Sequence, residues 1–114
     1  MTDLLLQRGL RLNFDDGPLI MGVVNANTDS FSDPRSDSSP QLVIDHAASL
    51  VSGGADLLDV GGQTASPAVP EIGVDEELER VIPVIEALAE ALPHVPLSVD
   101  SYRVEVAEAA LRAG

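Results

Sequence analysis

Polar side chains stand where three apolar runs of this 114-residue chain end, and their types suit the binding of a polar small molecule. They are Asn25 after the first run, Asp59 with Gln63 and Thr64 at the second, and Asp100 at the third. Carboxylates and amides offer hydrogen-bond acceptors, and the amide and hydroxyl groups also donate. The pair Gly61-Gly62 lets a backbone approach a ligand closely, and such loops can cradle phosphate.

Each of these features also has a simpler interpretation. A polar side chain at a strand end is often only a cap or turn former, and a Gly-Gly pair is often only a tight turn. In parallel α/β folds, however, ligands bind at the carboxyl ends of the strands, so three polar exits on one rim favour a shared site. The acidic run over residues 75–79 predicts a solvated helix face, and His46 and His94 lie too far apart in the chain to predict a ligand pair.

Alternating strand and helix patterns must position these residues. A short hairpin is expected over residues 4–7 and 10–13, with Arg8-Gly9 between its arms. Apolar runs predict strands over residues 19–24, 57–60 and 97–99, and the first of these predicts a strand buried on both faces. Helices are expected between Ser39 as N-cap and Gly53-Gly54, along the apolar stripe from 78 to 92 with a kink at Pro83, and from Ser101 as cap to Gly114 as C-cap.

Repeated strand–helix units imply a parallel sheet covered by helices. Two α/β architectures fit this order: part of a (β/α)₈ barrel, or a small doubly wound sheet. A complete barrel needs about 200–250 residues, so a chain of this length holds about three of eight units. We therefore expect residues 1–114 to form one partial domain, the front of a larger barrel with a leading hairpin.

Composition excludes several functions. Six lysines and arginines against nineteen aspartates and glutamates give a net charge of −13, which disfavours nucleic acid and anionic membranes as partners. The absence of cysteine excludes disulfides and thiol catalysis. No apolar stretch approaches the roughly 20 residues of a membrane-spanning helix or forms a signal peptide, so we expect a cytoplasmic protein.

Three segments resemble, in order, the signatures of dihydropteroate synthases. Residues 20–33 (IMGVVNANTDSFSD) are similar to a strand that ends in Asn-Val-Thr-Pro-Asp-Ser-Phe-Ser-Asp in that family. Residues 54–62 (GADLLDVGG) resemble the second signature, which continues Glu-Ser-Thr-Arg-Pro, and residues 97–102 (LSVDSY) resemble the third strand. The resemblance extends over residues 4–114, effectively the whole chain.

The resemblance implies a pterin-binding (β/α)₈ barrel in folate biosynthesis. Such enzymes are transferases that join 6-hydroxymethyl-7,8-dihydropterin pyrophosphate to 4-aminobenzoate and release pyrophosphate, with Mg²⁺ assisting the leaving group. By the family pattern, Asn25 would meet Mg²⁺ and pyrophosphate, and Asp100 would hydrogen-bond the pterin ring. Residues 25–39 and 61–73 would be two loops that close over 4-aminobenzoate. We expect the substrate-binding residues to include Asp59, Gln63, Thr64 and Asp100, and the full-length protein to form a homodimer.

The chain departs from the family pattern in both loops. Asn27-Thr28 stands where the family has Thr-Pro, and Ala65-Ser66 where it has Thr-Arg, which removes a charged contact to phosphate. The later Asp, Lys and Arg-x-His groups of the family lie beyond this length of chain. Two alternatives therefore stay open: a non-catalytic truncated or degenerate pterin-binding protein, and a methyltransferase of the methyltetrahydrofolate type.

Overall fold

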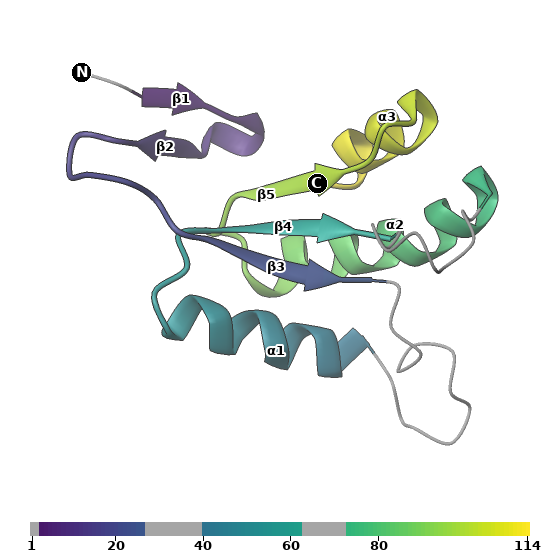
Figure 1. Ribbon diagram of the computed structural model, residues 1–114, viewed down its shortest axis with the longest axis horizontal. Helices are drawn as coiled ribbons and strands as arrows, with labels where there is room; N and C mark the ends of the chain where they lie inside the picture. Colours follow the sequence, from purple (N-terminus) through teal and green to yellow (C-terminus); the bar gives the residue numbers. More distant parts are fainter. Residues whose placement is uncertain (1–2, 27–39, 63–72) are drawn as a thin grey trace, which may run out of the picture.

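The computed structural model describes residues 3–26, 40–62 and 73–114, which alternate between strands and helices (Figure 1). The elements in chain order are β1 (Asp3–Leu5), the 3₁₀ helix η1 (Gln7–Gly9), β2 (Arg11–Asn13), β3 (Met21–Asn25), α1 (Pro40–Ser52), β4 (Leu57–Gly61), α2 (Val74–Ala91), β5 (Leu97–Asp100) and α3 (Val104–Ala113). After the hairpin, strand and helix follow one another three times, as the sequence predicts.

The strands β3, β4 and β5 form a parallel sheet in that order, and their arrows point the same way in Figure 1. The register places Asn25 beside Gly61 and Gly61 beside Asp100. The backbone N–H of Ala26 donates to the carbonyl of Gly61 at 2.8 Å, which extends the pairing by one residue. The carboxyl ends of all three strands therefore meet at one edge, as the strand–helix repeat requires.

One face of this sheet is covered by helices and carries the core. Val24, Leu58 and Val60 point to that face and are almost completely buried. They pack with side chains of all three helices, chiefly Ala47, Val81, Val84, Ile85, Leu88, Val106 and Ala110.

The opposite face, called the open face below, is not covered by the described residues. Met21 and Val23 of β3 point to it and are 51% and 65% exposed. The prediction that this strand is buried on both faces is therefore wrong for the described part of the chain. A continuous apolar run suits a strand whose two faces are both covered by other elements. The run itself cannot supply those elements, and among the described residues only one face of the sheet has them.

The turn that ends α1 explains why the sequence has Gly53-Gly54 at this point. Gly54 has a positive φ of 118°, its N–H donates to the Val51 carbonyl, and the N–H of Ala55 donates to the Leu50 carbonyl, each at 3.0 Å. This pair of bonds is a Schellman motif, which satisfies carbonyls that the helix leaves open. The predicted helix end is confirmed, whereas Ser39 lies outside the described residues.

The other two helices form where the sequence predicts them, but α3 begins later than expected. The Pro83 ring lies inside α2, which continues as one helix of 18 residues from Gly73 as N-cap. The N-cap of α3 is Arg103 rather than Ser101, and the Ser101 hydroxyl instead accepts a hydrogen bond from the Arg103 N–H at 3.2 Å. The helix thus starts two residues later than expected, and Gly114 is its C-cap as predicted.

The predicted hairpin is confirmed, with a longer connection. β1 and β2 pair antiparallel, with Leu4 opposite Leu12, and η1 joins them. The hairpin lies near the start of β5, away from the carboxyl ends of the strands (Figure 1). No helix within the described ranges combines the length and apolarity needed to cross a membrane.

Candidate functional site

The carboxyl edge of the sheet brings together three of the residues that the sequence singled out. Asn25 and Asp100 flank Gly61 across the register and are exposed, and Asp59 lies two residues earlier in the middle strand. Because side chains alternate along a strand, all three belong to the open face. The predicted gathering of Asn25, Asp59 and Asp100 at one rim is thus observed in the backbone register.

Asp59 has a partner that sequence reasoning missed. The Ser98 hydroxyl donates to its Oδ1 at 2.5 Å, and the register places Ser98 directly beside it on the open face. Hydrogen bonds to ionised carboxylates are short and stronger than neutral ones. The alternation of Leu97, Ser98 and Val99 is the signal that marks this serine, because it alone of the three faces away from the helices.

The exit of β4 shows why a glycine is needed there. A Cβ added at Gly62 would lie 2.7 Å from Cγ2 of Val81 and 3.4 Å from Cγ of Glu77, both on α2. Gly62 is therefore required for close packing of the strand exit on the helix, whatever binds nearby. Gln63 and Thr64, the other predicted site residues of this strand, lie outside the described residues.

A buried ion pair lies beneath the rim, and it corrects another prediction. Glu77 is 2% exposed, and its Oε1 accepts a hydrogen bond from Nη1 of Arg103 at 2.7 Å. The acidic run of α2 is therefore not solvated throughout: only the exposed members behave as predicted. The error arises because Glu77 falls on the same helix face as Val81, where α3 supplies its cation.

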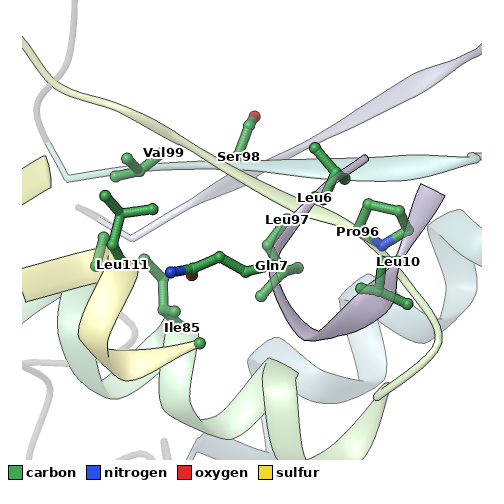
Figure 2. Close-up of a pocket in the computed structure, with 11 residues that line it drawn as sticks. Leu6, Gln7, Leu10, Ile85, Pro96, Leu97, Ser98, Val99 and Leu111 are labelled. Atoms are coloured by element: carbon green, nitrogen blue, oxygen red, sulfur yellow. The ribbon is translucent and has the colours of Figure 1, made fainter. Parts of the chain in front are cut away.

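A cavity of about 190 Å³ lies elsewhere, between the hairpin and the sheet (Figure 2). Its lining is mainly apolar and comes from η1 and its flanks, β5, α2 and α3, with Leu6, Leu10, Ile85, Leu97, Val99 and Leu111 among the side chains. In Figure 2 the hydroxyl of Ser98 points away from Gln7, the polar side chain on the cavity's other side. Ser98 also lines the cavity, whereas Asn25, Asp59 and Asp100 do not.

A family model and curated relatives, two dihydropteroate synthases among them, match this chain. The model for pterin binding enzymes matches residues 21–114. Dihydropteroate synthase from Synechocystis sp. is 44% identical over 95 residues, which are 83% of this chain and 32% of the relative. Dihydropteroate synthase from Bacillus subtilis is 37% identical over 113 residues, which are 99% of this chain and 39% of the relative. The chain thus spans 32% to 39% of the length of these relatives.

Solved structures agree with this match. Dihydropteroate synthase from Xanthomonas albilineans, solved with 4-aminobenzoic acid, superimposes with a TM-score of 0.83 at 44% identity. The superposition covers 94% of this chain and 39% of that one. These synthases are (β/α)₈ barrels, so the three described strand–helix units and the hairpin correspond to the N-terminal portion of such a barrel. The chain belongs to the pterin binding enzyme family.

Proposed function

We propose that this chain carries the pterin-binding strands of a dihydropteroate synthase. The reaction joins 6-hydroxymethyl-7,8-dihydropterin pyrophosphate to 4-aminobenzoate and releases pyrophosphate. The observation that carries the proposal is the row Asn25–Gly61–Asp100 on the open face of a chain from this family. The relatives named above are synthases, which favours this reaction over the methyltransferase alternative.

The two carboxylates of the open face suit a pterin ring. Asp100 is exposed at the edge, and Asp59 is half-buried one pleat below it, held by the Ser98 hydroxyl. A pterin presents adjacent N–H donors, for which carboxylates are strong acceptors. We assign Asp100 and Asp59 to the pterin, and on the family pattern we assign Gln63 and Thr64 to the substrates as well.

Mg²⁺ fits the remaining rim residue. Asn25 offers an amide oxygen, a hard ligand, and Mg²⁺ commonly takes one or two protein ligands while water and substrate phosphates supply the rest. Among the described residues, no three acidic or histidine side chains are placed to hold a metal ion together, so the ion would depend on the pyrophosphate for much of its coordination. When bound, Mg²⁺ would stabilise the charge of the departing pyrophosphate.

The substrates are small molecules, and the remaining expectations stay predictions. We propose that residues 1–114 form part of one barrel domain. The cytoplasmic location and the homodimer of the full-length protein rest on the sequence and on the family resemblance.

Calorimetric titration with 6-hydroxymethylpterin pyrophosphate, with and without Mg²⁺, tests the proposal. We expect Asp100→Ala to raise Kd by about 10-fold or more under both conditions, since hydrogen bonds to charged groups contribute about 1.5–3 kcal/mol. We expect Asn25→Ala to abolish the gain in affinity that Mg²⁺ provides and to leave metal-free binding unchanged.

Asp45→Ala is the matched control. Asp45 is an exposed aspartate of α1 whose carboxylate accepts from Gln41, away from the strand exits. Its removal changes the net charge as Asp100→Ala does and should leave Kd unchanged. Absence of binding by the folded wild-type chain would contradict the proposal and favour a non-catalytic relative.

A further inference from the structure

The buried carboxylate of Glu77 needs an explanation beyond stability. Glu77 is 2% exposed and Arg103, its partner from the start of α3, is 16% exposed in its side chain. Removing two charges from water costs free energy that their attraction often fails to recover, and apolar replacements of such pairs are frequently as stable. A pair of this kind therefore suggests that a defined geometry is being maintained.

On one side, the pair contacts the exit of β4. Cγ of Glu77 lies 3.4 Å, and its carbonyl oxygen 3.5 Å, from the position a Cβ of Gly62 would occupy. One helical turn later, Nη1 of Arg80 lies 3.4 Å from the Gly62 carbonyl, to which it donates. The first turns of α2 thus hold the end of the central strand directly beside Asp100, whose Cβ lies 3.5 Å from the Cβ position of Gly61.

On the other side, the pair contacts the turn after β5. Arg103 follows Asp100 by three residues, and its backbone N–H donates to the Ser101 hydroxyl. Its Nη2 lies 3.1 Å from the Tyr102 hydroxyl, and its guanidinium lies 5.1 Å from the centre of the Tyr102 ring. Arg103 therefore orders the residues between Asp100 and α3 through both its backbone and its side chain.

We propose that the Glu77–Arg103 ion pair positions Asp100 for pterin binding by fixing the β5–α3 turn against the exit of β4. The inference rests on the proposed pterin site and adds two positioning residues that do not touch the ligand. An ion pair can position a neighbouring segment because its charged hydrogen bond fixes both a distance and an angle, whereas apolar contacts have no preferred direction. Small displacements of a binding carboxylate are enough to weaken its hydrogen bonds.

The decisive variant is the double substitution Glu77→Met with Arg103→Met. It replaces both charges with unbranched apolar side chains, so the fold is expected to be retained, whereas either single variant would leave an uncompensated charge. We expect the melting temperature to stay close to that of the wild type, while Kd for 6-hydroxymethylpterin rises about tenfold, the effect of losing one hydrogen bond to the charged carboxylate of Asp100. Pterin fluorescence reports binding cleanly because the chain has no tryptophan.

A mutant cycle that combines the ion-pair variant with Asp100→Ala separates the positioning of Asp100 from general damage to the binding site. If the pair acts through Asp100, adding Glu77→Met and Arg103→Met to Asp100→Ala will weaken binding no further, whereas independent effects would multiply. The matched control is Glu86→Met with Arg112→Met, which removes the same residue types from exposed positions of the same two helices. It should leave Kd unchanged.

The outcomes distinguish this inference from the proposed function. Loss of affinity in Asp100→Ala, with none in the folded Glu77→Met, Arg103→Met variant, overturns the positioning role alone. Multiplying effects in the triple variant also overturn it. If Asp100→Ala binds like the wild type, or if the wild type does not bind, the pterin site itself is refuted and the positioning role falls with it.

Discussion

Gly62 shows how one atom decides whether the exit of β4 can pack on α2. A Cβ at this position would lie 2.7 Å from Cγ2 of Val81, which is fully buried. We expect Gly62→Ala to lower the free energy of unfolding by about 1–3 kcal/mol, since overpacking forces neighbouring groups to move. Urea denaturation of the purified chain measures the change.

Val81→Ala supplies the control for this prediction. It removes the methyl group that the Cβ introduced by Gly62→Ala would strike, so Gly62→Ala should cost less in the Val81→Ala background than in the wild type. Each substitution is measured alone and together. Equal costs in the two backgrounds would show that the contact with Val81 does not determine the choice of glycine.

Among the elements, α2 carries an internal proline at a measurable cost. Pro83 is exposed within the helix and lacks the N–H that would bond to the Glu79 carbonyl. We expect Pro83→Ala to stabilise the chain by about 2 kcal/mol, the helix penalty of proline being partly offset by the freedom alanine adds to the unfolded state. Thermal unfolding followed by circular dichroism at the helix band tests this.

Pro93→Ala is the control, for which we expect a change in stability opposite in sign to that of Pro83→Ala. It lies just beyond Leu92, the C-cap of α2, where no helical hydrogen bond is lost. Pro93→Ala should destabilise the chain slightly, by about 0.4–1 kcal/mol, because it only loosens the unfolded state. A loss of stability in Pro83→Ala would mean that the helix depends on the proline for its path.

At the scale of the whole molecule, the open face of the parallel sheet is not covered by any of the described residues of this 114-residue chain. Met21 and Val23 are exposed on the open face, and β3 and β5 are the outer strands of the parallel sheet. Exposed apolar patches and unpaired strand edges promote association between copies. We expect the chain to self-associate as its concentration rises, which light scattering coupled to gel filtration will show.

Two lysine substitutions locate the surface responsible. Val23→Lys places a charge on the open face and should reduce association. Leu42→Lys places the same charge at an exposed leucine of α1, on the helical side, and should not. A monodisperse wild-type monomer at high concentration with a sharp two-state melt would contradict this prediction.

Much of the architecture was predictable from local patterns. The apolar runs, the helix end at Gly54, the C-cap at Gly114 and the strand–helix alternation are each encoded within a few residues. Parallel strands share a carboxyl edge by their connectivity, so the row Asn25–Gly61–Asp100 was also within reach. These features follow from propensity and periodicity, which do not depend on distant partners.

Contacts between distant segments were decided by the tertiary structure. Glu77 belongs to an acidic run whose other members are exposed, and its burial depends on Arg103, 26 residues away, arriving on α3. The pairing of Ser98 with Asp59 likewise depends on the register between β4 and β5. The sequence by itself therefore determined the order of the elements and the rim they form. Which polar side chains are buried and paired beneath it was decided by packing, because burial depends on the neighbours that the fold supplies.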